Sequence, residues 1–335
     1  MKKGLLIIIP LVLIFISLQT GCSVNESDTQ KILSHPPYDA LSDSIRQFPD
    51  NPRYYLERGL LLSQNNKHEI ATVDYKKAWE LSSDEGVALE YASNLLLLNR
   101  TNEALLFLND CRKKFPANIE FGRRISEVYA QTGRRKEALA EYDKMIEQDS
   151  LNFMAWYERG LLLVRLRDTV AALQSLQRSY TIQPINYTGL AMANIYSNQK
   201  DPRVVAICDD MLKKDSTGQM VDALLLKGIY YSDTKQYNTA LSLFEECIKR
   251  DWKFTQAYIE KGIVLFDQKQ YTKALEVFKM GATVSNTNAD TYFWLGRCYE
   301  ELKDKEQAEE NFERALSLDR DLVEAEDGIE RLKKN

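Results

Sequence analysis

The chain has 335 residues, of which 28% are charged and 44% hydrophobic, and its formal net charge at pH 7 is −5. Proteins that bind nucleic acid without sequence preference take most of their affinity from lysines and arginines that neutralise phosphates. The acidic balance argues against that class, so we expect no nucleic-acid partner.

Residues 1–21 have the features of a cleaved export signal. Met1-Lys2-Lys3 gives a positive start, residues 5–18 form an almost unbroken apolar run, and Thr20-Gly21 places small residues before a cysteine. The run is 14 residues long, whereas a bilayer span takes roughly 20 residues. Cleavage is therefore favoured over an uncleaved signal anchor. It removes two lysines and leaves a net charge of −5 − 2 = −7.

Residues 18–22, Leu-Gln-Thr-Gly-Cys, resemble the lipobox of bacterial lipoproteins. The resemblance implies that the Cys22 thiol takes a diacylglyceryl group and that the freed amine is then acylated. Gln19 stands where the family usually has an aliphatic residue. Several acyl chains together hold a protein stably on a membrane, whereas one chain holds it only marginally. Ser23 follows the cysteine, and by resemblance to known sorting signals this favours the periplasmic face of an outer membrane. An ordinary secreted protein is the alternative.

Two segments are predicted between the signal and the body of the chain. Residues 22–37 are expected to be a polar tether, because few of them could bury apolar surface. Residues 38–51 are expected to form a capping helix, with Leu41 and Ile45 facing inward.

Residues 52–322 repeat one pattern of small and large residues. In the clearest copy, Gly296 is followed by Ala308, Phe312 and Ala315. This spacing predicts two amphipathic helices joined by a tight turn, with small residues where the helix backbones come close. Steps of 34 residues, with one step of 33, find the alanine in eight consecutive units. These alanines are Ala71, Ala104, Ala138, Ala172, Ala206, Ala240, Ala274 and Ala308.

The unit at residues 187–220 departs most from the pattern. Asn194 replaces its glycine, and Asp210 stands in the aromatic position after Ala206.

The spacing and residue types resemble the tetratricopeptide repeat, whose unit is 34 residues long. The resemblance implies an all-α fold, an α-solenoid of about eight helix-turn-helix units wound as a right-handed superhelix. Residues 323–335 are expected to cap the far end, because Ala325, Ile329 and Leu332 form one apolar stripe with a polar back.

The resemblance also implies that the first helix of each unit lines a concave groove. Positions three before and one after the glycine are mostly apolar, which suits a protein or peptide partner bound as a helix or an extended strand. The alternative is that these side chains pack against neighbouring first helices. The lysines and asparagines with which chaperone-binding relatives clamp a terminal carboxylate are missing. The predicted groove residues are Arg123, Arg124, Glu127, Tyr157, Leu161, Leu225, Ile229, Ile259, Ile263, Phe293 and Arg297.

Charge is unevenly distributed along the repeats. Residues 100–136 contain nine basic and four acidic residues, whereas the chain from Ala289 onward is acidic. These stretches are either solvated faces or contact surfaces. In the second case Arg123 and Arg124 would receive an anionic partner segment, or the two ends would attract one another in a head-to-tail homodimer.

The sequence does not bring catalytic residue types together. His35 and His68 are far from any matching cysteine or carboxylate pair, and no metal-ligand spacing is present. We expect no enzyme activity, no metal and no cofactor beyond the acyl groups on Cys22. The remaining cysteines fall inside repeat helices and are predicted to pack as small apolar residues. They are Cys111, Cys208, Cys247 and Cys298; a Cys208–Cys247 disulfide is the alternative between adjacent repeats.

These features indicate an exported, lipid-anchored and non-catalytic scaffold of a bacterial envelope, which binds a protein partner. Similar repeat lipoproteins assist outer-membrane assembly, pilus or secretion machinery, or wall-remodelling enzymes. The alternatives are a regulator that recruits a wall hydrolase or protease, and a soluble cytoplasmic co-chaperone.

Overall fold

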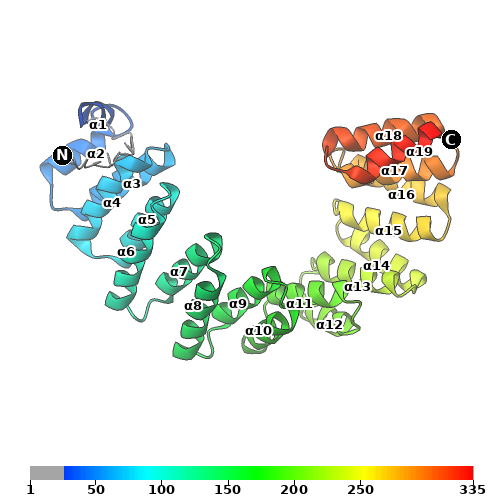
Figure 1. The fold of residues 1–335 in the computed structure, drawn as a ribbon, viewed down its shortest axis with the longest axis horizontal. Coiled ribbons are helices and arrows are strands. Elements are labelled where there is room, and N and C mark those ends of the chain that lie inside the picture. The colour runs from blue at the N-terminus through cyan, green and yellow to red at the C-terminus, as the bar shows by residue number, and fades with distance from the viewer. Residues whose placement is uncertain (1–25, 335) are drawn as a thin grey trace, which may run out of the picture. The chain divides into compact units, whose positions relative to one another are not determined.

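The computed structural model describes residues 26–334, and the regular secondary structure in this range consists of nineteen helices (Figure 1). The predicted export signal and Cys22 lie outside the described residues. None of the helices in residues 26–334 is long and apolar enough to cross a membrane. The chain divides into two compact units, Met1–Val128 and Tyr129–Asn335, and each is described by itself.

The first unit stacks its helices in chain order. Helix α2 packs on α3, α3 on α4, α4 on α5 and α5 on α6. Its core includes the buried side chains of Tyr38, Leu62, Tyr75 and Leu95. The helices are α1 (Glu26–Leu33), α2 (Asp39–Gln47), α3 (Pro52–Gln64), α4 (His68–Ser82), α5 (Glu85–Leu97), α6 (Thr101–Lys114) and the start of α7 (Ile119–Gln131).

Part of the predicted tether is a helix. Residues 26–33 form α1, and its last residues, Ile32 and Leu33, are half-buried against the core that contains Tyr38. The Ser42 hydroxyl of α2 donates to the Leu33 carbonyl at 2.8 Å. Two apolar residues are enough here because the first repeat offers an apolar face beside them. The predicted capping helix is α2, which is shorter than expected and ends before Phe48-Pro49.

The second unit continues the pairing to the end of the described chain. Its pairs are α9 with α10, α11 with α12, α13 with α14, α15 with α16 and α17 with α18, and α19 packs on the last pair. The helices are α8 (Arg135–Gln148), α9 (Phe153–Arg165), α10 (Thr169–Ile182), α11 (Asn186–Asn198), α12 (Arg203–Lys214), α13 (Val221–Asp233), α14 (Tyr237–Arg250), α15 (Thr255–Asp267), α16 (Tyr271–Val284), α17 (Ala289–Glu301), α18 (Lys305–Leu318) and α19 (Val323–Lys334).

Glycine lets the two helices of a unit approach closely. A Cβ atom at Gly296 would lie 2.6 Å from Cδ1 of the Phe312 ring, and one at Gly228 would lie 2.5 Å from Cε1 of Phe244. Both rings are fully buried. The sixteen-residue spacing between glycine and ring therefore has the packing role that the sequence predicted, and the chain folds as a tetratricopeptide-type α-solenoid of paired helices.

Tight turns join the paired helices, and most contain one residue in the left-handed region. These residues are Asn66, Asn99, Gly133, Arg167, Lys200, Lys235, Lys269 and Lys303. In one example the Lys269 N–H donates to the Phe266 carbonyl at 2.8 Å and the Gln270 N–H donates to the Leu265 carbonyl at 2.9 Å. Carbonyls at the end of the first helix are thereby satisfied. The predicted left-handed turn at Gly133 is confirmed, with φ of 76°.

The unit at residues 187–220 packs in a different register from the one predicted. Elsewhere the second helix buries three residues, spaced by four and then by three. In α12 this spacing belongs to Val204, Cys208 and Met211, each with 0% exposure. Ala206 and Asn194, which the sequence pattern placed in the core, are exposed. The prediction was therefore wrong for this unit.

Two local features account for the changed register. Pro202, whose fixed φ suits a helix start, is the N-cap residue of α12, so the helix begins only at Arg203. The six-residue loop 215–220 then restores the 34-residue phase, and the Asp215 carboxylate accepts hydrogen bonds from backbone N–H groups within it. Asp210 is not an aromatic substitute; its carboxylate accepts from the Tyr180 hydroxyl at 2.7 Å.

Candidate partner-binding surface

The first helices of the second unit form a continuous side, which we call the first-helix surface. It comprises α9, α11, α13, α15 and α17. Helix α11 contacts α13, α13 contacts α15 and α15 contacts α17. At the start of the row, Tyr157 of α9 and Tyr187 of α11 meet edge to face, with ring centroids 4.6 Å apart.

The predicted apolar groove residues of this unit divide into two sets. Leu225, Ile259 and Phe293 are buried, with 8%, 2% and 9% exposure. They pack inside the stack, as the alternative interpretation expected. The other set is half-buried and contributes to the surface itself. Its members are Tyr157, Leu161, Ile229 and Ile263.

An aromatic cluster joins α15 to α17. The rings of Phe266 and Trp294 meet edge to face with centroids 5.3 Å apart. The Arg297 guanidinium lies 5.3 Å from the Phe266 centroid and 6.0 Å from the centroids of Phe293 and Trp294. Its Nε is 3.4 Å from Oε2 of Glu300. Sequence reasoning named Phe293 and Arg297 but missed Phe266 and Trp294. Extending the comparison to four after and two before the glycine would have found them.

A half-buried carboxylate lies in the middle of the same helices. Glu260 of α15 accepts one hydrogen bond, from Nε2 of Gln256 at 2.9 Å. Burial raises the pKa of Glu260, and the negative charges of Asp233 on α13 and Asp290 on α17 raise the pKa further. Three successive first helices therefore place like charges near one another.

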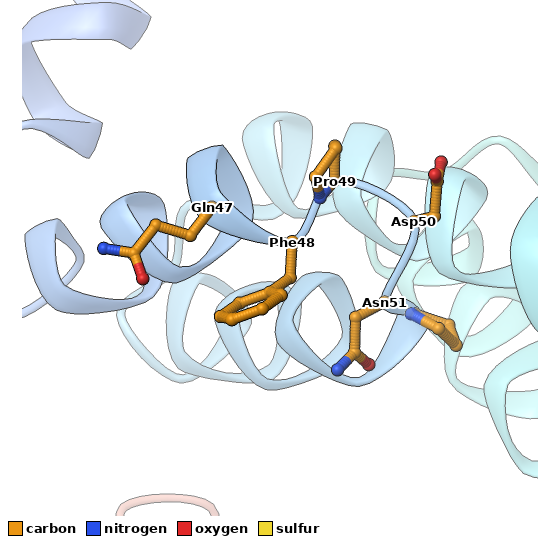
Figure 2. Close-up of a pocket in the computed structure, with 6 residues that line it drawn as sticks. Gln47, Phe48, Pro49, Asp50 and Asn51 are labelled. Carbon is orange, nitrogen blue, oxygen red and sulfur yellow. The ribbon is translucent and has the colours of Figure 1, made fainter.

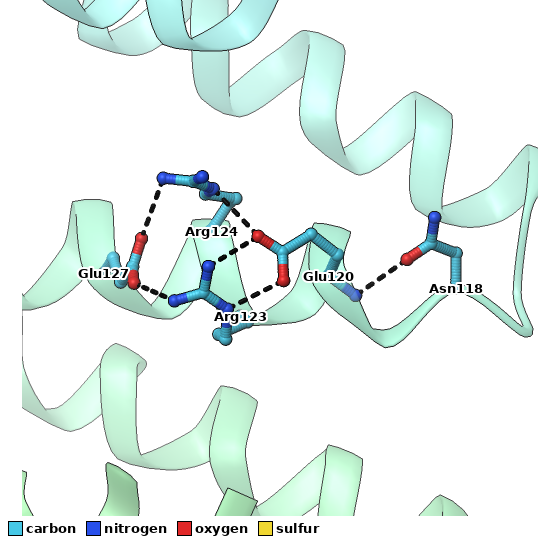
Figure 3. Close-up of polar contacts among 5 residues, drawn as sticks. All are labelled: Asn118, Glu120, Arg123, Arg124 and Glu127. Carbon is cyan, nitrogen blue, oxygen red and sulfur yellow. Dashed lines mark hydrogen bonds and ion pairs between the residues drawn. The ribbon is translucent and has the colours of Figure 1, made fainter. Parts of the chain in front are cut away.

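The predicted anion-binding arginines belong to the first unit, where they are already paired. Arg123 contacts both Glu120 and Glu127, and its Nε lies 2.8 Å from Oε2 of Glu120 (Figure 3). Arg124 Nε lies 3.0 Å from Oε1 of Glu120, and its Nη1 lies 3.5 Å from Oε2 of Glu127. The hydrogen bond from Arg123 is the largest of the effects that lower the pKa of Glu120. An anionic partner segment would have to compete with these carboxylates.

The first unit also contains open hollows away from the predicted groove residues. Figure 2 shows one of about 530 Å³, lined by residues 47–52 of the loop between α2 and α3, where Phe48 is 55% exposed. A second, of about 380 Å³, includes Trp79 and Phe107. Their rings meet edge to face with centroids 5.4 Å apart.

The two histidines take part in local contacts. His35 Nδ1 lies 2.8 Å from the Lys31 carbonyl oxygen, and His68 Nδ1 lies 3.1 Å from Oδ1 of Asn94. Within residues 26–334, no group of three or more His, Cys, Asp or Glu side chains is placed to hold a metal ion.

The four cysteines of the repeat helices are buried and free, which confirms that they pack as small apolar residues. Burial raises the pKa of Cys208, Cys247 and Cys298 to about 12 and that of Cys111 to about 11. Cys208 and Cys247 are not joined by a disulfide.

Two family models, each described as "Tetratricopeptide repeat", match this chain. One matches residues 221–251 and 289–322, and the other matches residues 124–186. Neither model describes a catalytic family.

Individual relatives are distant. A "TPR repeat-containing protein" of Treponema pallidum (strain Nichols) is 28% identical over 132 residues, which are 33% of this chain and 16% of that protein. Among solved structures, a tetratricopeptide repeat protein from Parabacteroides merdae ATCC 43184 has a TM-score of 0.44 and 16% identity. That match covers 85% of this chain and 99% of the other. PilW, described as a type IV pilus biogenesis factor, has a TM-score of 0.49 and 18% identity, with 62% and 97% covered.

Proposed function

We propose that this chain, which is a tetratricopeptide repeat protein, is a non-catalytic scaffold that binds a protein partner on its first-helix surface. Repeat arrays commonly bind proteins on the extended surfaces that their stacked helices create. The observation that carries the proposal is the row of half-buried apolar side chains on successive first helices. Leu161, Ile229 and Ile263 stand on α9, α13 and α15 at the position just after the glycine.

A second part of the proposal concerns location. We propose that the protein is exported and held on a bacterial envelope by acyl chains on Cys22, with the periplasmic face of the outer membrane favoured. The positive start, the short apolar run and the lipobox-like residues 18–22 support this. The membrane would then be reached through the anchor.

The binding surface can be tested with a pull-down from detergent-solubilised membranes. Aspartate at Ile229 and Ile263 would place charge on the surface, and we expect the double variant to lose the partner. The matched control is Val170→Asp on the second helix α10, where the side chain is 69% exposed and outside the surface. Circular dichroism would show that both variants are folded. Equal capture by the double variant and the control would refute binding on this surface.

The identity of the captured protein would separate two roles. Secretion, pilus or assembly subunits would support a scaffold of an envelope machine. A wall hydrolase or protease would instead support a regulator that recruits an enzyme.

The anchor needs its own test. We expect the wild-type protein to partition into the detergent phase of a Triton X-114 extract and Cys22→Ala to move to the aqueous phase. Partitioning that depends on Cys22 would rule out a soluble cytoplasmic co-chaperone. Aqueous partitioning of the wild type would refute the anchor.

A further inference from the structure

The charges on α13, α15 and α17 are strongly unbalanced on the first-helix surface. Asp233, Asp267 and Glu301 each stand five residues after the glycine of their unit, so they occupy equivalent places on three stacked helices. Glu260 and Asp290 add two more carboxylates. Against these five, Arg297 is the cation on the same surface, and it is already engaged by three aromatic rings and Glu300.

Carboxylates that meet other sides of these first helices are paired differently. Lys227 of α13 lies 2.5 Å from Oδ1 of Asp209, and Lys261 of α15 lies 3.0 Å from Oε1 of Glu245. Both acids belong to the preceding second helix. Among the described residues Glu260 has no such cation: its hydrogen-bond partner is the neutral Gln256, and Asp233 and Asp290 are its charged neighbours. A carboxylate removed from water is costly unless it is paired.

The surroundings of Glu260 provide the other half of a binding surface. Ile229 and Ile263 are half-buried beside it in the row, and the rings of Phe266 and Trp294 lie one turn further along. Aromatic rings attract cations placed over their faces. Arg297 shows that this part of the chain can hold a guanidinium by rings and a carboxylate together.

We propose that the partner segment bound on α13, α15 and α17 is basic and apolar, with a lysine or arginine that pairs with Glu260 between Asp233 and Asp290. This inference rests on the proposed function and names the chemistry of its partner. Apolar side chains of the segment contact Ile229 and Ile263, and a second cation contacts the rings of Phe266 and Trp294. Complementary charge also steers the encounter and disfavours acidic segments.

The test uses two synthetic amphipathic peptides with the same leucine pattern. One carries lysine at every polar position and the other carries glutamate, and binding to the folded protein is measured by fluorescence anisotropy. We expect the lysine peptide to bind at least about tenfold more tightly than the glutamate peptide, and its affinity to fall as salt is raised. Glu260→Gln should weaken the lysine peptide by about tenfold, since one well-desolvated charge pair is lost.

The control is Glu313→Gln on the second helix α18, where the residue is exposed and the change in net charge is the same. It should leave the affinity unchanged. Glu260→Gln removes an unfavourable half-buried charge, so its thermal midpoint should be no lower than that of the wild type. This measurement excludes unfolding as the cause of weaker binding.

Equal or tighter binding of the glutamate peptide would overturn the inference. So would equal losses in Glu260→Gln and Glu313→Gln, or failure of the lysine peptide to bind. If the lysine peptide fails while wild-type protein still captures a membrane partner through Ile229 and Ile263, the proposed function stands and only its basic partner is wrong. If that capture fails too, the proposed function falls with it.

Discussion

Arg58 and Asp74 form a buried, two-pronged ion pair inside the first repeat. Arg58 Nε lies 2.7 Å from Oδ2 of Asp74, and Nη2 lies 2.7 Å from Oδ1. Arg58 Nη1 also donates to the Ser42 hydroxyl at 2.9 Å, which connects α2 to the pair of α3 and α4. Burial raises the pKa of Asp74, and the hydrogen bonds from Arg58 act in the opposite direction.

Loss of one partner of this pair should be costly. We expect Arg58→Met to lower the free energy of unfolding of the first unit by about 3–5 kcal/mol, because it leaves a buried carboxylate unpaired. Urea unfolding followed by circular dichroism measures this. The double change Arg58→Met with Asp74→Leu should cost much less than the single change, since no buried charge remains. A single variant as stable as the wild type would mean that water reaches Asp74.

Gly296 tests the contact that closes a helix pair. In Gly296→Ala the new methyl group would overlap the buried Phe312 ring, so we expect a loss of about 1–3 kcal/mol, as for other overpacked cores. Thermal and urea unfolding provide the measurement. In a Phe312→Ala background the same change should cost little, because the ring is absent. Additive effects of the two changes would show that the glycine is not there to admit the ring.

Lys269 tests the strain stored in the inter-helix turns. Its φ is 60°, a region that disfavours side chains with a Cβ. We expect Lys269→Gly to raise the stability by up to about 1 kcal/mol, since the relief of strain exceeds the added chain entropy. The matched control is Glu276→Gly, an exposed site inside the neighbouring α16, which should lower the stability by about 1 kcal/mol. The same sign for both variants in urea unfolding would contradict this account of the turn.

The repeat spacing predicted the helix pairs because each pair depends on local contacts, such as Gly296 with Phe312, that recur every 34 residues. It failed at residues 187–220, where a delayed helix start and a longer loop cancel within one unit. Ala206 therefore kept the alanine phase in the sequence while Val204 took the alanine's place in the core.

The candidate surface was predicted less well than the fold. Which first-helix side chains are buried depends on the neighbouring helix, so Ile259 and Ile263 cannot be told apart by their residue type. The pairing of Arg123 within its own helix was equally hidden. The basic residues were counted over a stretch of sequence, whereas the carboxylates that neutralise them lie three and four residues away on one helix face.

The loop that restores the repeat phase gives the chain a defined acid sensitivity. The Asp215 carboxylate accepts from the Thr217 hydroxyl at 2.7 Å and from the N–H groups of Thr217, Gly218 and Met220 at 3.0, 3.0 and 2.9 Å. These bonds, the one from the Thr217 hydroxyl first, lower the pKa of Asp215 to about 2. In an unfolded chain the pKa of an aspartate is about 3.9.

A lowered folded-state pKa fixes the sign of the pH dependence. The stabilisation by Asp215 is fully present above about pH 4 and is lost as the pH falls towards 2, because the unfolded chain binds the proton first. We expect Asp215→Asn to lower the thermal midpoint at pH 7 and the gap from the wild type to narrow between pH 4 and pH 2. The control Asp50→Asn, at an exposed loop residue of the first unit, should leave the midpoint unchanged throughout. A gap for Asp215→Asn that stays constant down to pH 2 would show that the loop is held by contacts other than the ionised carboxylate.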